Sequence, residues 1–279
     1  MKTIALFGAA GKMGTRIAEN IKDDPEYKVL YVEGNEAGIQ KLRERNLEPT
    51  TSEEASKEAD VVIFAIPDRL IGKVAKEIVP SLKSGAMLIC LDPAAPHAGE
   101  LPDRKDVSYF VVHPCHPPLI NDEIDPEARM DFFGGTKAKQ NIVCALMQGT
   151  DDDYKLGEEI SRKIFAPVMN AYRITVEQMA ILEPAMAEVV AFTCMVIIRE
   201  AMDEAIKQGV PEEVAKAFML GHLNVDVGIL FNFIDAQVSD GAKQVMERAK
   251  KTLFQPDWKE VLKPENVLKE VKAIVAGSN

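Results

Sequence analysis

Cysteine is scarce in this chain of 279 residues, and the few cysteines are not arranged in pairs. The four cysteines, Cys90, Cys115, Cys144 and Cys194, are scattered through apolar surroundings. This spacing argues against a disulfide framework and is typical of reduced thiols in a reducing compartment. We therefore expect the fold to be stabilised by packed cores alone.

Long apolar runs are also missing, as is an excess of positive charge. No apolar run approaches the roughly 20 residues that span a bilayer, and the amino-terminal Met1 to Thr3 leads directly into a strand-like run. We expect a cytoplasmic protein that does not enter the membrane. The net charge of −11 argues against nucleic acid as a partner, because phosphates attract basic surfaces. A small molecule is the expected ligand.

The length fits about two domains, and the pattern of the first is an alternation of strands and helices. Short apolar runs alternate with helical stretches as far as about Arg173, which predicts an α/β fold with a doubly wound, mostly parallel sheet over residues 1–174. The expected strands are Ile4 to Phe7, Val29 to Glu33, Val61 to Ile66, Met87 to Leu91, Tyr109 to Val112 and Ile142 to Met147.

Residues 175–279 are expected to form a second, all-helical domain. Thr175 and Gln178 have the spacing of a capping box, and a helix-periodic apolar stretch follows to about Gln208. Further helices are predicted over residues 212–231, 240–252 and 264–275. The run from Val189 to Ile198 is apolar on nearly all sides, which favours a homodimer formed through this domain. Burial of that helix within its own chain is the alternative.

A glycine-rich turn follows the first predicted strand and opens a helix. Gly8, Gly11 and Gly14 meet the demands of a tight strand-to-helix turn that lets the backbone approach a diphosphate at the helix N-terminus. The spacing departs mildly from the commoner fingerprint, because Ala10 stands where a second glycine usually falls. The intervening Lys12 and Met13 are expected to border the same ligand.

Glu33 ends the second predicted strand, about 20 positions past the glycines, where an acidic side chain accepts hydrogen bonds from an adenosine ribose. Its charge would repel a 2′-phosphate, and no arginine follows it, so NAD is favoured over NADP. A merely solvated glutamate is the alternative. Pro67 and Asp68 follow the third strand and are expected to line the same cofactor, although they also suit a plain loop.

Two histidines lie three residues apart in a proline-rich segment, His113-Pro-Cys-His116-Pro-Pro, after a predicted strand. Imidazole transfers protons near neutral pH and also ligates metals, and a stiff backbone holds it in one geometry. Both uses stay open here. Asp92, after another strand, is placed to orient a histidine or to cap a turn.

Glu183 lies in an apolar helical stretch beside Pro184, which is expected to loosen the helix locally. A carboxylate in such surroundings needs a partner, such as a metal, a histidine or a substrate hydroxyl, unless it lies on a surface bend. His222 and Asn224 form another polar island, and satisfied local hydrogen bonding is the expected reason for both.

Several motifs together resemble the D-apionate oxidoisomerase family over nearly the whole chain. They begin at Gly8 (GAAGKMG), Leu91 (LDPAAP), Val112 (VHPCHPPL), Cys144 (CALMQG), Gln178 (QMAILEP) and Gly221 (GHLNV). That group is similar, more distantly, to 6-phosphogluconate dehydrogenase and ketol-acid reductoisomerase, which combine a Rossmann domain with a helical dimerisation domain.

The resemblance implies NAD-dependent oxidation of a branched sugar acid, D-apionate, with skeletal rearrangement to 3-oxo-isoapionate. A 1,2-shift calls for a Lewis acid that holds adjacent oxygens. On this basis His113 and Glu183 are expected to ligate a divalent metal, Zn²⁺ in preference to Mg²⁺ or Mn²⁺, with His116 as the acid/base and Asp92 as a second catalytic group.

Two other functions fit the same motifs. A simple NAD-dependent hydroxyacid or prephenate-type dehydrogenase would need no rearrangement and no metal, because a fold by itself does not name a reaction. A non-catalytic NAD-sensing module would bind a protein partner through its helical half. The paired histidines argue against this second alternative.

Overall fold

The computed structural model describes residues 1–277, and the chain forms two compact units. The first unit contains Met1–Pro184 together with the chain from Val267, and the second contains Ala185–Asn266. This division differs from the expected boundary at 174/175. The helix that follows residue 175 buries Val176 and Met179 in the core of the first unit, and the last helix returns there through Val267 and Val271.

A seven-stranded sheet forms the centre of the first unit, in the order β2-β1-β3-β4-β5-β6-β7. The first five strands are parallel, whereas β6 runs antiparallel to β5 and β7 is parallel to β6. The bounds are β1 (Lys2–Phe7), β2 (Tyr27–Val32), β3 (Val61–Phe64), β4 (Met87–Cys90), β5 (Ser108–Pro114), β6 (Gln140–Gln148) and β7 (Val168–Arg173). The mostly parallel sheet is confirmed, and its edge strand β7 was not predicted.

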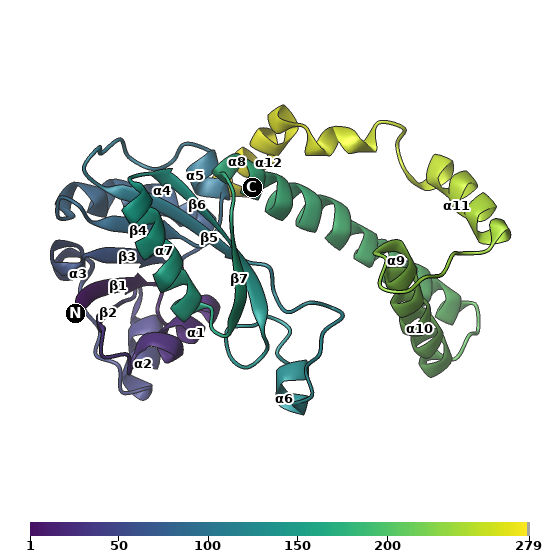
Figure 1. Cartoon of the computed structure of the whole chain (residues 1–279), viewed down its shortest axis with the longest axis horizontal. Helices are drawn as coiled ribbons and strands as arrows, with labels where there is room; N and C mark the ends of the chain where they lie inside the picture. The colour runs from purple at the N-terminus through teal and green to yellow at the C-terminus, as the bar shows by residue number, and fades with distance from the viewer. Residues whose placement is uncertain (278–279) are drawn as a thin grey trace. The chain divides into compact units, whose positions relative to one another are not determined.

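Helices cover both faces of this sheet (Figure 1). On one face lie α1 (Lys12–Ile21), α2 (Glu36–Glu44) and α7 (Asp151–Ile164), whose apolar sides belong to the hydrophobic cluster that includes the fully buried Phe110. On the other lie α3 (Ser52–Glu58), α4 (Asp68–Ile78) and α8 (Val176–Ala180), which belong to the cluster that includes Phe64. Short helices complete this unit: η1 (Val79–Ser81), α5 (Ala94–His97) and α6 (Pro126–Arg129).

A long helical stretch leaves the sheet at Thr175, whose capping box with Gln178 is present as predicted. It runs through α8, the π-helix η2 (Ile181–Phe192) and α9 (Thr193–Lys207). Pro184 lies inside η2, so the helix widens where a loosened turn was expected. The remaining helices are α10 (Glu212–Leu230), α11 (Asp240–Leu253), η3 (Trp258–Leu262) and α12 (Pro264–Ala276).

Val176–Lys207 is long and apolar enough, by length and composition alone, to cross a membrane. This corrects the expectation that no stretch approaches that limit. Only 11% of its most apolar window is buried inside the chain. Phe192 and Met195, for example, are 68% and 50% exposed. An apolar surface of this extent is typical of a region that contacts another molecule.

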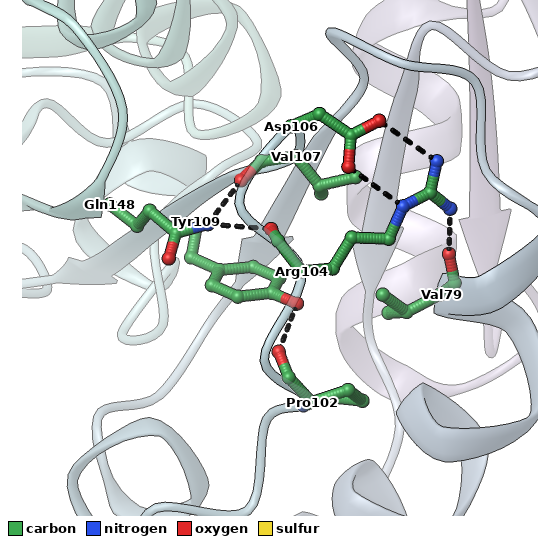
Figure 2. A network of polar contacts seen from close by, with 7 residues as sticks. All are labelled: Val79, Pro102, Arg104, Asp106, Val107, Tyr109 and Gln148. Atoms are coloured by element: carbon green, nitrogen blue, oxygen red, sulfur yellow. Dashed lines mark hydrogen bonds and ion pairs between the residues drawn. The ribbon is translucent and has the colours of Figure 1, made fainter.

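A network of polar contacts fixes the end of β6 against the segment that precedes β5 (Figure 2). The Gln148 amide donates to the carbonyls of Arg104, at 2.8 Å, and Val107, at 2.6 Å. The Arg104 guanidinium in turn donates to the carbonyl of Val79 and to both carboxylate oxygens of Asp106. The Gln148 side chain therefore donates to two backbone carbonyls where the antiparallel pairing of β5 and β6 ends, and the Arg104 carbonyl also accepts from the Val107 N–H at 3.3 Å.

Replacing Gln148 by leucine should destabilise the first unit by about 1 to 3 kcal/mol, because the Val107 carbonyl loses its donor and the Arg104 carbonyl keeps only the long bond from the Val107 N–H. Denaturant unfolding measures the change. The same substitution at Gln40, an exposed residue of α2, is the matched control and should alter stability by less than about 0.5 kcal/mol. Equal effects at the two positions would contradict this role of Gln148.

Candidate functional site

The glycine-rich turn joins β1 to α1, and two of its glycines have no room for a side chain. Gly8 has a φ of +79°, and a Cβ there would lie 2.3 Å from the carbonyl oxygen of Ala65. A Cβ at Gly14 would lie 2.0 Å from the carbonyl oxygen of Gly8. The turn therefore packs directly against the end of β3 and leaves the N-terminus of α1 open to a ligand.

A cleft runs across this turn at the point where the strand order reverses, between β1 and β3. One hollow of about 500 Å³ lies toward β2, and a second of about 380 Å³ lies toward β4 and β5. Both are bordered by Gly11 and by residues 65–67. Two adjoining hollows on either side of a helix N-terminus suit the two halves of a dinucleotide, with the diphosphate between them.

The predicted cofactor residues gather in this cleft. The first hollow is lined by Gly8, Ala10, Gly11, Glu33 and Pro67, and the second by Gly11, Lys12, Met13, Pro67 and Asp68. Gly14 lines neither hollow, because its role is to close the turn.

Glu33 is held firmly at the outer end of the first hollow. Its Oε1 accepts a hydrogen bond from the backbone N–H of Ala10 at 2.5 Å. Gly38, in the first turn of α2, leaves space for the other oxygen, since a Cβ there would lie 2.6 Å from Oε2. The negative charge of this carboxylate therefore stands at a fixed position in the wall of the cleft.

At the other end, Asp92, His113 and Glu183 converge. Asp92 lies two residues after β4, His113 lies in β5, and Glu183 lies in the π-helix η2. Each offers one ligand atom, and these atoms all lie within 4.8 Å of one another. The three residues belong to the first unit of the chain. Here the sheet and the widened helix bring one imidazole and two carboxylates together.

The tautomer of His113 follows from its neighbours. Its Nδ1 lies 2.9 Å from the carbonyl oxygen of Leu91, which can only accept, so Nδ1 carries a hydrogen. Its Nε2 is buried and lies 3.3 Å from Oε2 of Glu183, and within residues 1–277 it has no partner in hydrogen-bonding geometry. A buried nitrogen without a hydrogen bond is costly unless another group binds it.

The residues of this cluster shift one another's pKa values. Burial alone would lower the pKa of His113, but Glu183, Asp92 and the Leu91 carbonyl outweigh it and raise that pKa to about 9. Burial would raise the pKa of Glu183, yet the imidazole holds it below its usual value. Burial and the neighbouring Asp92 raise the pKa of Asp68 to about 6. At neutral pH His113 is therefore protonated and paired with Glu183, and a divalent cation that binds here would replace the proton on Nε2.

The donor set fits a divalent cation. One imidazole nitrogen and two carboxylates within 4.8 Å of one another are a combination that Zn²⁺ and related ions accept, and the oxygens also suit harder ions. His113 and Glu183 were predicted as ligands, and the structure adds Asp92 to them. Oδ2 of Asp92 lies 3.7 Å from Nδ1 of His113, while Oδ1 accepts from the N–H of Ala94 at 2.7 Å. Asp92 therefore also caps a turn.

His116 lies beside the cluster, with its ring centroid 6.2 Å from that of His113. Its Nδ1 lies 2.9 Å from the carbonyl oxygen of Phe133, so Nδ1 again carries the hydrogen and Nε2 holds the lone pair in the neutral ring.

His222 lies in α10 of the second unit, where its ring stacks on Phe218 with the centroids 4.0 Å apart and its Nδ1 donates to the Phe218 carbonyl. Local contacts thus account for His222.

Comparisons with known proteins agree with this geometry. The family model of the acetohydroxy acid isomeroreductase NADPH-binding domain matches residues 1–122, and that of the phosphogluconate dehydrogenase (decarboxylating) C-terminal domain matches residues 121–275. The chain is 47% identical to a D-apionate oxidoisomerase of Cupriavidus necator over 97% of its own length and 98% of that protein. It is 48% identical to one of Rhizobium rhizogenes, over 98% and 100%. The chain belongs to the D-apionate oxidoisomerase family.

Solved structures show the same fold. A semialdehyde dehydrogenase NAD-binding protein from Cupriavidus necator, in complex with calcium and NAD, is 47% identical, with a TM-score of 0.94 over 98% of this chain and 99% of that one. An NADH-preferring ketol-acid reductoisomerase from an uncultured archaean has a TM-score of 0.69 over 97% and 82% at 19% identity, which supports the fold alone. The Rossmann domain followed by helices is confirmed.

Proposed function

We propose that this chain is an NAD-dependent D-apionate oxidoisomerase that uses a divalent cation held by Asp92, His113 and Glu183. The observation that carries the proposal is the convergence of these three side chains at the end of the dinucleotide cleft. A nearly full-length relationship to proteins named for this reaction supports the substrate class. A relative in complex with calcium and NAD supports the pairing of a cofactor with an ion.

The two halves of the reaction make different demands on the protein. Oxidation transfers a hydride from a carbinol carbon to the nicotinamide while a base removes the hydroxyl proton. A cation in the cluster would supply the Lewis acid that polarises adjacent oxygens for the 1,2-shift. The chain's own residues fix the geometry, because Leu91 holds the imidazole of His113 and Ala94 holds the carboxylate of Asp92. Nε2 of His116 is the nitrogen free to accept the proton.

NADH formation by the metal-free chain, then with Zn²⁺, Mn²⁺, Mg²⁺ or Ca²⁺ added, tests the proposal against D-apionate and a panel of other sugar acids. We expect turnover of D-apionate only with a cation, and a product with a rearranged carbon skeleton by NMR. Glu183→Gln should lower turnover at least about 100-fold, because the cluster loses a charged ligand. Glu177→Gln, in the adjoining helix α8, is the matched control and should leave turnover unchanged.

Each of the other two functions has its own outcome in this experiment. Cation-independent oxidation of a hydroxy acid to an unrearranged ketone would replace the proposal with a simple dehydrogenase. If the chain bound NAD but oxidised none of the acids with any cation, the sensing module would be favoured.

The position of Glu33 leads to a prediction about cofactor choice. Glu33→Ala should weaken NADH binding roughly tenfold, because hydrogen bonds from the ribose to a charged acceptor are lost. NADPH binding should strengthen, because the repulsion of the 2′-phosphate disappears. Fluorescence titration of both cofactors measures the ratio, with Glu44→Ala in α2 as the control. An unchanged ratio in Glu33→Ala would sink the assignment of Glu33 to the ribose.

We also propose that a second copy of the chain covers the apolar surface of the second unit. The large exposed side chains there include Phe192, Met195, Phe218, Leu220, Leu230 and Phe231. The helix that carries part of this surface is anchored at its start in the first unit and holds Glu183 in the polar cluster, which disfavours a bilayer as the covering phase. Light scattering should give the mass of a dimer, and a monomer at micromolar concentration would contradict the proposal.

A further inference from the structure

His116 has an unusual backbone and an unusual neighbour. Its φ is +60°, a left-handed conformation that is unfavourable for a non-glycine residue and persists only where contacts enforce it. Besides the His113 ring, its side chain contacts Phe133, which lies 17 positions later in the segment that joins β5 to β6. The carbonyl oxygen of Phe133 accepts from Nδ1 of His116, and the two rings meet edge to face at 6.0 Å.

Phe133 is itself held by the helix of the glycine-rich turn. The ammonium of Lys12 lies 3.1 Å from the centroid of the Phe133 ring, and the guanidinium carbon of Arg16 lies 5.3 Å from it. The next residue of the same stripe, Asn20, donates to the carbonyl of Gly135 at 3.1 Å. These three residues are spaced by four and therefore lie along one side of α1. Cation–π attraction holds the ring because its face is electron-rich.

Phe133 is too exposed for a residue whose main role is packing in a hydrophobic core. Phe133 is 45% exposed, and its neighbour Phe132 is 71% exposed, with no ring or cation contact among the described residues. Of these two adjacent surface phenylalanines, only Phe133 contacts both the helix of the glycine-rich turn and His116.

We infer that Phe133 is the positioning residue for His116. This inference rests on the function proposed above. Phe133 sets which nitrogen of the His116 imidazole is free to accept the substrate proton. The Phe133 carbonyl keeps the hydrogen on Nδ1 of His116, and cation–π contacts of the Phe133 ring with Lys12 and Arg16 of α1 hold that carbonyl in place. Phe133 thereby fixes the position of His116 relative to α1, the helix whose N-terminus faces the diphosphate. Loss of the ring releases His116 from its strained backbone and lets the tautomer change.

The direct test is nitrogen-15 NMR of the histidine side chains in the full chain, at a pH where the imidazole is neutral. The chain has only four histidines, so His116 can be assigned with a His116→Gln variant. The wild-type chain, Phe133→Tyr and Phe132→Ala should show the Nδ1–H tautomer of His116. Phe133→Ala should lose it. Phe133→Tyr keeps an aromatic face for Lys12 and is the rescue variant.

Kinetics give the second readout. Phe133→Ala should lower kcat for the sugar acid roughly 10- to 100-fold and change KM less than about threefold, because proton transfer suffers and ground-state binding does not. Phe133→Tyr and Phe132→Ala should stay near wild type, and thermal unfolding checks that each variant folds. An unchanged tautomer and kcat in Phe133→Ala, or an equal loss in Phe132→Ala, overturns the inference. If the wild-type chain oxidises no sugar acid, the proposed function fails, and the NMR spectra alone decide the role of Phe133.

Discussion

The structure of the site depends on one hydrogen bond, from Nδ1 of His113 to the backbone carbonyl of Leu91. Because a carbonyl only accepts, this bond leaves Nε2 to face Glu183 at 3.3 Å, where no residue in the described part of the chain hydrogen-bonds it. Leu91 directly follows β4 and His113 lies in the neighbouring β5, so the bond is a product of parallel strand pairing. The sheet therefore fixes the tautomer as well as the position of the imidazole.

The same sheet places the cofactor cleft next to the polar cluster. The glycine-rich turn follows β1, Pro67 and Asp68 follow β3, and Asp92 follows β4, all at the carboxyl ends of parallel strands. Only Glu183 arrives from outside the sheet, on a π-helix that contains a proline. The extra width of such a helix shifts its side chains relative to an α-helix, and segments of this kind are frequent at functional sites. The cluster therefore depends both on the order of the strands, which places Asp92 and His113, and on the π-helix, which places Glu183.

Some of this arrangement is readable from the sequence. The glycines were predictable because a tight strand-to-helix turn imposes local requirements on residue type, and Glu33 stands beside that turn as expected. That Glu33 binds the ribose stays a prediction. The capping box at Thr175 is local as well. In contrast, β7 escapes prediction because it is a half-exposed edge strand, with a polar Asn170 and Arg173 and no apolar run. The unit boundary differs from the expected one because α12 returns to the first unit after about 80 residues elsewhere, and no local pattern records that return.

The metal-type cluster was only partly predictable, for a related reason. His113 and Glu183 were predicted as a pair from residue type and family resemblance, and Asp92 was placed beside them as an orienting group. Ligands on separate elements have no diagnostic spacing, so only the folded sheet shows that Asp92 reaches the same point.

A crystal structure of the chain grown with Mn²⁺ and NAD, with anomalous diffraction collected for manganese, tests the central claim most directly. The account predicts an anomalous peak within coordination distance of Nε2 of His113 and of the Asp92 and Glu183 carboxylates, with the diphosphate on the turn from Gly8 to Gly14. A well-ordered cofactor with no peak at the cluster, and Nε2 of His113 hydrogen-bonded to Glu183 or to water, would contradict it.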